Sequence, residues 1–233
     1  MVNIVQLIDP KGSFIMSAVP PLAPMSQARG RIHAAAMQLF AERGVTKVNI
    51  SELAEAAGMA RGTIYSHVTD IDSLFEEVAA ELAHDMTARV VASFAGISDP
   101  ARRLAIGVRQ FIRRAHEEPL WGRFVSRFGL SDVTWQEVQA TAPFADVVAG
   151  IESGRYRISR DQVPAMVSLI AGGTLAAMQP VLQGHCTWRE IGADTAELML
   201  VALGLSNKEA RELARSELPP LLNMPRNRSH DPA

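Results

Sequence analysis

The sequence predicts an all-α protein in which a small N-terminal domain of three short helices precedes a larger helical C-terminal domain. Apolar residues recur at spacings of three and four along most of the chain, which is the period of an amphipathic helix. Glycine, proline and capping residues divide these segments into helices of ordinary length. From residue 95 onward no segment shows sustained alternation of apolar and polar residues, so we expect no sheet there.

Residues 1–25 are expected to form a flexible arm. The first helix follows this arm and is expected to end at Arg43. Arg43 places a cation in the last turn, and Gly44 can adopt the left-handed conformation that ends a helix. Its apolar stripe is wide and follows the pattern i, i+3, i+4, i+7, i+8. The stripe consists of Ile32, Ala35, Ala36, Leu39 and Phe40.

Two short helices separated by a glycine-containing turn are expected next. The apolar residues from Ile50 to Ala57 share one helical face, Asn49 is placed to cap that helix, and Gly58 to end it. The second helix begins near Arg61 and has few apolar residues that need to face inward. This layout is typical of a helix-turn-helix, whose second helix enters the major groove of DNA.

A longer fourth helix follows, for which Asp70 is the expected N-cap. Its buried stripe contains Leu74, Phe75, Val78, Leu82 and Met86. We expect this helix to belong to both domains, so that it links them mechanically.

The C-terminal domain is predicted to be a succession of helices. Ser98-Asp99-Pro100 is a cap followed by a proline in the first turn, and Pro119 is expected to end the helix that it opens. Further helices are expected over 120–130, from Ser131 or Asp132, and over 143–154, 190–204 and 207–217, with an extended connection at 156–158.

Residues 162–188 contain no Asp, Glu, Lys or Arg. A transmembrane helix is one interpretation, but Pro164, Gly172-Gly173 and Pro180 interrupt the segment. We favour a helix buried on both sides, inside its domain and against a partner copy. Together with 190–204 it would form a four-helix interface between two copies, and we expect no membrane association.

The helix-turn-helix region resembles the TetR-type transcriptional regulators. Residues 31–44 resemble the first helix of that family, residues 50–67 its helix-turn-helix, and Leu74-Phe75 the start of its fourth helix. The resemblance implies an N-terminal domain that binds operator DNA as a homodimer. It also implies a C-terminal domain that binds a small-molecule inducer and dimerises. Val48, Val68 and Ile71 depart from the family pattern, and Val48 and Ile71 predict fewer phosphate contacts.

The expected domain organisation has four parts. Residues 1–25 are the arm, 26–86 the DNA-binding domain, 87–218 the effector-binding and dimerisation domain, and 219–233 a flexible tail.

The DNA-contacting residues are expected on the second helix of the motif and around it. Arginine can bond guanine with two hydrogen bonds, threonine can contact a thymine methyl, and tyrosine and histidine can donate to phosphates or bases. Gly62 allows the backbone to approach phosphate closely. The candidates are Arg31, Lys47, Asn49, Ala60, Arg61, Gly62, Thr63, Tyr65, Ser66 and His67.

Aromatic and methionine side chains of the C-terminal domain are candidates for an inducer pocket, because they suit an apolar ligand. Plain core packing is the alternative for each of them. The candidates are Trp121, Phe124, Phe128, Trp135, Phe144, Met166 and Met178.

Charge and cysteine content narrow the function further. The net charge is −2, and residues 26–75 carry five cations and five acids, so affinity for DNA is expected to be modest and salt-sensitive. The single cysteine, Cys186, fits a reducing, cytoplasmic compartment. His185-Cys186 has no partners at metal-ligand spacing, so we expect neither a metal nor a cofactor.

No nucleophile elbow, glycine-rich phosphate loop or zinc-protease motif is present, so we do not expect an enzyme. The sequence favours a ligand-responsive repressor that an apolar inducer releases from a palindromic operator. The alternative is a helical dimeric interaction protein that has weak or lost DNA binding, in agreement with Val48, Ile71 and the equal numbers of cations and acids over residues 26–75.

Overall fold

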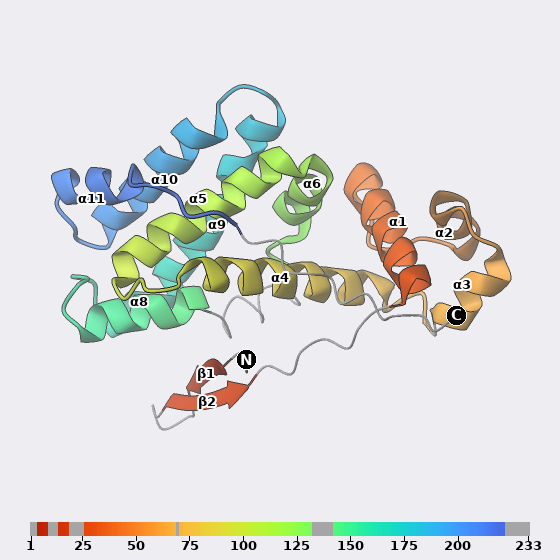
Figure 1. Ribbon diagram of the computed structural model, residues 1–233, viewed down its shortest axis with the longest axis horizontal. Coiled ribbons are helices and arrows are strands. Elements are labelled where there is room, and N and C mark those ends of the chain that lie inside the picture. The colour runs from red at the N-terminus through yellow and green to blue at the C-terminus, as the bar shows by residue number, and fades with distance from the viewer. Residues whose placement is uncertain (1–3, 9–13, 19–25, 69, 132–141, 222–233) are drawn as a thin grey trace.

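The computed structural model describes residues 4–8, 14–18, 26–68, 70–131 and 142–221. Helices dominate these residues, and Figure 1 shows two helical lobes that the long helix α4 joins. The fold class predicted from the sequence is confirmed. The helices are α1 (Gln27–Arg43), α2 (Ile50–Ala57), α3 (Arg61–His67), α4 (Leu74–Ser93), α5 (Pro100–Glu117), α6 (Pro119–Phe128), α8 (Ala142–Glu152), α9 (Val163–Leu182), α10 (Trp188–Ala202) and α11 (Asn207–Ala214), with a 3-10 turn at Arg160–Gln162.

An antiparallel hairpin precedes the helices. Strand β1 (Ile4–Ile8) pairs with β2 (Phe14–Ala18), with Ile4 opposite Ala18. A flexible arm was predicted for residues 1–25, whereas these two segments of it form paired strands. Both segments are rich in apolar and β-branched residues, which suit a strand.

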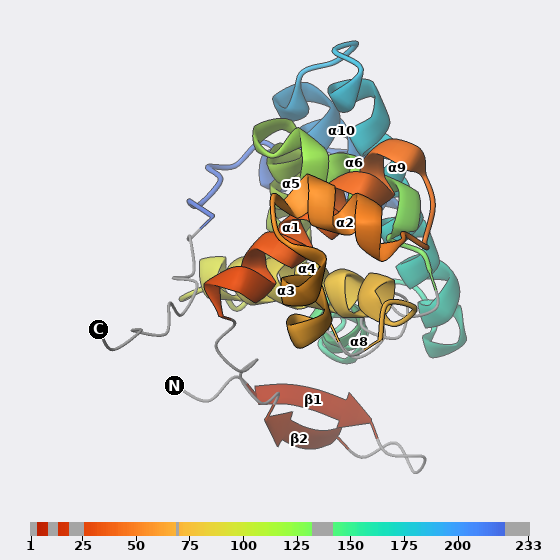
Figure 2. The same ribbon diagram turned by 90° about the vertical axis from the view of Figure 1, so that its right-hand side faces the viewer.

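Helices α1, α2 and α3 form the head, which Figure 2 views from its outer side. The Asn49 side chain accepts from the Glu52 N–H while the Glu52 carboxylate accepts from the Asn49 N–H, so a complete capping box starts α2. Gly58 ends α2 with φ of 61°, a conformation that favours glycine. One small core holds the head together. Its fully buried members include Ile32, Ala36, Phe40, Leu53 and Ile64.

Helix α4 begins later than the sequence suggested. Asp70 was expected to cap it, but Ser73 directly precedes the helix, and the Asp70 carboxylate instead accepts from the Asp72 N–H at 2.9 Å. That bond closes a turn before the helix, because an aspartate side chain readily bonds the backbone two residues on. Further along, α4 passes from the head core, at Leu74, to the C-terminal core, at Met86. The expectation that α4 belongs to both lobes is confirmed.

The C-terminal lobe is built around α5, which packs on α6, α8, α9 and α10. Asp99 caps α5, and the Arg155 guanidinium binds both oxygens of Asp99 and also Glu209 at the start of α11. Pro119 does end α5, as expected, and it also opens α6 in the first turn. Pro219 accepts a hydrogen bond from Gln110, so the chain beyond α11 contacts α5.

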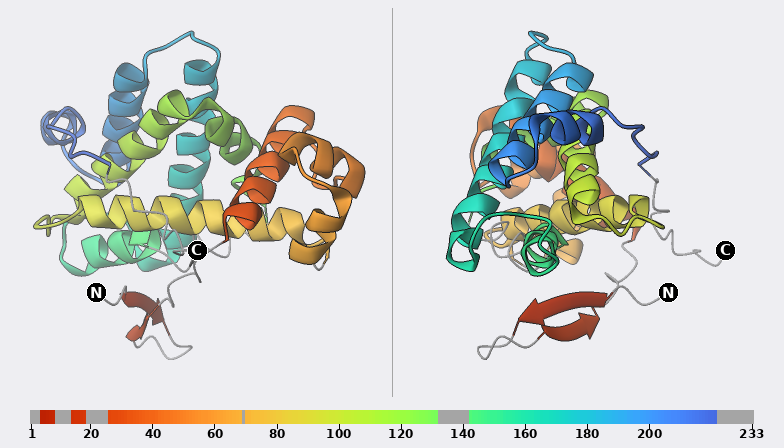
Figure 3. Two further views of the ribbon diagram at one scale, coloured as in Figure 1. Left: turned by 45° about the vertical axis from the view of Figure 1, so that its right-hand side comes forward. Right: turned by 90° about the vertical axis from the view of Figure 1, so that its left-hand side faces the viewer.

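Helices α9 and α10 run alongside each other, as Figure 3 shows in its teal and blue segments. Within the described residues, one segment, Arg160–Leu182, is long and apolar enough to cross a membrane by length and composition alone. One face of α9 nevertheless lies in the core of the lobe through Met166, Ile170 and Met178. Leu169 on α9 and Leu198 on α10 are 62% and 70% exposed, so part of both helices stays uncovered in the single chain.

Candidate nucleic-acid interface and ligand cavity

Helix α3 lies at the surface of the head and presents its polar side outward. Ile64 is fully buried and anchors the helix, whereas Arg61 and Ser66 are exposed and Tyr65 is 66% exposed. Thr63 is half-buried, and so is His67 in the last turn of α3, while Ala60 is exposed at the N-cap position. An exposed large aromatic residue on a polar helix is available for contact with another molecule.

The cations of the head differ in how far they are already engaged. Residues 26–75 are described apart from residue 69, and in this stretch Arg29 pairs with Glu77, Arg43 with Glu52, and Lys47 with Asp72. Arg61 is the head cation for which these described residues provide no hydrogen-bond or ion-pair partner. A phosphate or a base edge can therefore bind Arg61 without first breaking an internal contact.

Two of the predicted DNA contacts, Arg31 and Asn49, are engaged at the two ends of α2. Arg31 donates from Nη2 to the carbonyl oxygens of Ala57 (2.7 Å) and Gly58 (3.2 Å), so it satisfies the C-terminal end of α2. Asn49 holds the capping box at the other end of the same helix. Arg31 therefore ties α1 to the C-terminal end of α2, while Asn49 caps the N-terminal end.

Gly62 and Lys47 leave room for an outside partner. A Cβ atom built on Gly62 would meet no atom within 4 Å, so the chain itself does not require glycine there. Lys47 and Asp72 are 78% and 67% exposed, and such a surface pair contributes little, so phosphate can displace the carboxylate. The Ser66 hydroxyl donates to the Thr63 carbonyl oxygen within α3.

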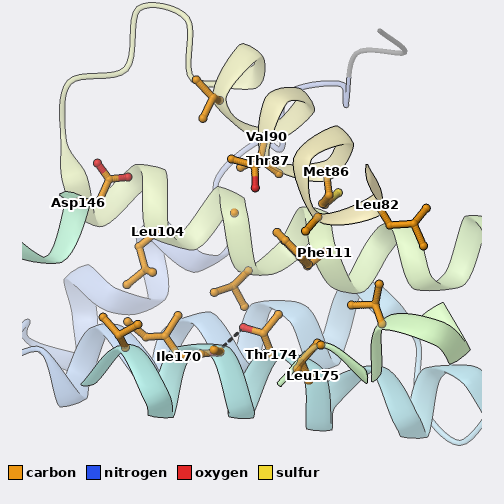
Figure 4. Close-up of a pocket in the computed structure, with 18 of the residues that line it drawn as sticks. Leu82, Met86, Thr87, Val90, Leu104, Phe111, Asp146, Ile170, Thr174 and Leu175 are labelled. Carbon is orange, nitrogen blue, oxygen red and sulfur yellow. Dashed lines mark hydrogen bonds between the residues drawn. The ribbon is translucent and has the colours of Figure 1, made fainter. Parts of the chain in front are cut away.

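A cavity of about 140 Å³ lies in the C-terminal lobe between α4, α5, α6 and α9. Most of its lining is apolar, and Figure 4 shows side chains from several of these helices pointing toward one another across it. The lining includes Leu82, Met86, Val90, Phe111, Trp121 and Ile170. A mostly apolar space between helices with a few polar groups is the usual form of a small-molecule site.

Some of the residues predicted to form the pocket line this cavity, and others do not. Trp121 and Phe124 line it. Met166 and Met178 are buried in the surrounding core but do not line it, and Phe144 packs only against that core. Phe128 is turned toward the head. Trp135 lies outside the described residues.

The cavity face of α4 was not predicted as a binding surface. Its apolar residues looked like ordinary core positions, because periodicity marks a buried face but does not show whether a void lies behind it.

One end of the cavity is charged. Asp146 of α8 pairs with Arg103 of α5, and both residues line the cavity. Burial raises the pKa of Asp146 from 3.8 to about 6, although the Arg103 charge and hydrogen bond act in the opposite direction. The Nε of Arg103 is buried and has no acceptor. Figure 4 draws Asp146 beyond Leu104, at the edge of the lining opposite Leu82.

Aromatic rings connect the cavity with the head. Phe75 of α4 lies with its ring centroid 5.3 Å from that of Phe40 and 5.0 Å from that of Phe128, both with edge-on geometry. Arg127 of α6 donates to the carbonyl oxygen of Ala41 in α1 at 3.2 Å. Helix α6 therefore touches the cavity on one side and α1 on the other.

The described residues contain no group of three or more His, Cys, Asp or Glu side chains that could hold a metal ion. Cys186 is exposed and not in a disulfide.

Comparison with curated proteins gives partial matches. The chain is 40% identical to the HTH-type transcriptional regulator AcrR of Shigella flexneri over 52 residues, which are 22% of this chain and 24% of AcrR. It is 36% identical to the HTH-type transcriptional repressor Rv1474c of Mycobacterium tuberculosis over 87 residues, which are 37% of this chain and 46% of the repressor. The chain thus spans less than half the length of these relatives.

Solved structures match over most of the chain. RolR in complex with resorcinol is 28% identical, with a TM-score of 0.62 over 84% of this chain and 97% of RolR. FadR from Bacillus subtilis in complex with stearoyl-CoA is 17% identical, with a TM-score of 0.63 over 73% of this chain and 97% of FadR. The second likeness shows the fold alone.

Family models cover both lobes. The model described as bacterial regulatory proteins, tetR family, matches residues 32–78, where α1, α2 and α3 lie. The model described as tetracyclin repressor-like, C-terminal domain, matches residues 99–216, which are half of the chain and include the α5, α8 and α9 sides of the cavity. The chain belongs to the TetR family of bacterial transcriptional regulators.

Proposed function

We propose that this protein is a homodimeric repressor that binds a palindromic operator through α3 and is released when a small, mainly apolar molecule enters the C-terminal cavity. The observation that carries the proposal is the position of α4. One end of this helix belongs to the core under α3, and the other end lines the cavity.

DNA binding is assigned to α3 and its surroundings. Arg61 and Tyr65 are the foremost candidates for base and phosphate contacts, because both are exposed and Arg61 has no partner among the described residues. Gly62 allows close approach to the DNA backbone. Lys47 contributes a phosphate contact, whereas Arg31 and Asn49 act by positioning α2.

Dimerisation is assigned to the uncovered faces of α9 and α10. Leu169, Ala176, Leu198 and Ala202 are exposed on these two helices, and exposed leucines on adjacent helices favour association. A second copy that packs there in a two-fold arrangement forms a four-helix interface. The dimer also presents two copies of α3, and two such helices are required to read successive major grooves about 34–36 Å apart.

Ligand binding is assigned to the cavity. Its apolar walls suit an apolar molecule, and RolR, which shares 28% identity and this fold, has been solved with the single-ring compound resorcinol. A ligand that binds better to a dimer whose two α3 helices cannot span adjacent grooves would shift the population away from DNA. The extent of that shift is limited by the ligand's differential affinity for the two states.

A gel shift with the DNA upstream of the protein's own gene tests the proposal. We expect a sequence-specific complex that weakens steeply between about 50 and 200 mM salt, because phosphate contacts release counterions. Absence of a specific complex at either salt concentration would contradict DNA binding and favour a helical interaction protein.

A further inference from the structure

We infer that the C-terminal cavity selects a neutral, single-ring molecule with a hydroxyl group, and that Arg103 and Asp146 hold this hydroxyl. The inference rests on the proposed function in one respect, namely that the cavity is the effector site. It goes further in naming the chemical class of the effector and the two residues that recognise it.

The size of the cavity limits the ligand to about one ring. Its volume is about 140 Å³. An engineered apolar cavity of about 150 Å³ binds benzene, so the space here corresponds to a single six-membered ring with a small substituent. A long acyl chain or a fused-ring compound would extend beyond this space.

The walls favour a flat aromatic ring. Phe111 and Trp121 both line the cavity, with ring centroids 6.0 Å apart and planes inclined by 49°. Phe124 lines it from the same helix as Trp121. Aromatic rings prefer offset or edge-on contacts, which a planar ligand can make with these side chains.

The polar end requires a group that both donates and accepts. Arg103 and Asp146 are the charged residues among the described lining residues, and they come from different helices. The Arg103 Nε–H is buried without an acceptor, and a carboxylate has several acceptor positions of which this ion pair uses one. The Trp121 Nε1–H, also in the lining, is buried without an acceptor as well. A hydroxyl can accept from Arg103 and donate to Asp146 at once, so it satisfies the unpaired Arg103 donor that lies beside the carboxylate.

Other groups fit this end less well. A ligand carboxylate would place a second negative charge beside Asp146 in a buried site. A hydrocarbon would leave the Arg103 donor without a partner. The Thr174 hydroxyl, also in the lining, already donates to the Ile170 carbonyl oxygen at 2.6 Å, so it cannot take over the same role by donation.

Calorimetric titration of the full-length protein tests the class directly. The probes are phenol, toluene, benzoate and 1-decanol. We expect phenol to bind at least about tenfold more tightly than toluene, because a site built to bond a hydroxyl discriminates against the analogue that lacks it. We also expect benzoate and decanol to bind more weakly than phenol. Toluene binding as tightly as phenol, or benzoate or decanol binding more tightly than phenol, would overturn the inference.

A double variant tests the two residues. Arg103→Leu combined with Asp146→Leu removes both charges together and leaves no unpaired ion, and Arg102→Leu removes an exposed neighbouring arginine as the matched control. We expect the ratio of phenol to toluene affinity to fall to about one in the double variant and to persist in the control. A persistent ratio in a folded double variant would contradict the assignment, and if the variant does not fold, the ligand series on the natural protein still decides the class.

Operator binding, measured separately, keeps the two proposals distinguishable. If toluene or decanol binds best and releases the operator, the repressor function stands and the ligand class is wrong. If phenol binds as expected but leaves the operator complex unchanged, the ligand class stands and the proposed response is wrong.

Discussion

The ring centroids of Phe124 and Phe75 lie 5.9 Å apart, with the two ring planes inclined by 38°. Phe124 lines the cavity of the C-terminal lobe, whereas Phe75 belongs to the first turn of α4 and packs edge-on against Phe40 in the core of the head. A ligand that moves Phe124 therefore acts on a ring that supports α1. This contact is a direct physical connection between the two proposed binding sites.

Replacing Phe124 with leucine is expected to weaken the coupling between ligand and operator. Leucine keeps the site apolar but removes the aromatic contact with Phe75, which contributes about 0.5–1.5 kcal/mol. Saturating phenol should lower the operator affinity of both proteins. We predict that the factor by which it does so is about threefold to tenfold smaller in the variant than in the natural protein. Fluorescence anisotropy with labelled operator, with and without phenol, measures this difference. Phe111→Leu changes a lining residue away from the head and serves as the control, and equal coupling in both variants would argue against the aromatic connection.

Replacing Arg61 with alanine is expected to weaken operator binding without affecting assembly. Arg61 is exposed on α3 and far from α9 and α10 along the chain, and loss of one good base contact costs about 1–3 kcal/mol. We predict at least about a tenfold loss of operator affinity and an unchanged molar mass in light scattering. Arg102→Ala, on the exposed side of α5, should leave operator affinity unchanged. Full affinity of Arg61→Ala would remove this residue from the interface.

Replacing Arg31 with alanine is expected to act through stability. Its guanidinium satisfies the carbonyl groups of Ala57 and Gly58 at the end of α2, so its loss should lower the free energy of unfolding by about 1 kcal/mol. Urea denaturation followed by circular dichroism measures the change. A normal unfolding midpoint combined with strongly reduced operator affinity would instead show that Arg31 contacts DNA directly.

The buried carboxyl of Asp146 predicts a pH dependence of stability. Its pKa is about 6 in the folded protein against 3.8 in the unfolded chain, so the folded state binds the proton more tightly. The contribution of Asp146 to stability is therefore present below pH 3.8 and is lost as the pH rises through 6, by about 3 kcal/mol at most. Arg103 and Tyr156 share this environment, and burial, with Asp146 adding to it, raises the pKa of Tyr156, so the tyrosine stays neutral over the window.

Asp146→Asn removes the titrating group and isolates its effect. We expect the unfolding free energy of the natural protein to fall relative to that of the variant between pH 4 and pH 6.5, as measured by denaturant titration at several pH values. Parallel stability curves over this range would contradict the raised pKa.

Replacing Leu198 with glutamate is expected to disrupt the dimer. Leu198 is 70% exposed on α10, so the change costs little in the single chain but would bury a charge at the proposed interface. Sedimentation analysis should show a shift from dimer to monomer and a loss of operator affinity. Leu130→Glu introduces the same change at a leucine that is 53% exposed outside α9 and α10, and it should remain dimeric. If both variants remain dimeric, this face is not the interface.

The head could be predicted largely from the sequence because local signals determine it. Asn49 and Gly58 mark the two ends of α2 by capping and by left-handed backbone, and both occupy those positions in the structure. Asp70 shows the limit of such signals, because the same side chain that can cap a helix can also close the turn before it. The sequence alone does not decide between these two roles of an aspartate.

The cavity could be predicted only in part because it depends on contacts between distant residues. Trp121 and Phe124 were found by residue type, but Met166 looked equally suitable and lies in solid core. The pairing of Arg103 with Asp146 joins two helices that no sequence spacing relates. A charged pair facing a void is visible only once the helices have been packed.

The distance between the two α3 helices of a dimer tests the central claim most directly. A spin label at Glu55→Cys, an exposed position on α2 outside the proposed DNA contacts, in a Cys186→Ser background that removes the natural exposed thiol, allows pulsed electron paramagnetic resonance to follow the separation of the two heads. With operator DNA we predict a single narrow distribution, because both α3 helices then lie in major grooves about 34–36 Å apart, and a shift or broadening when a cavity ligand is added. The account would be contradicted if no distance between two copies could be detected. It would also be contradicted if the distance measured on DNA were incompatible with binding in adjacent major grooves.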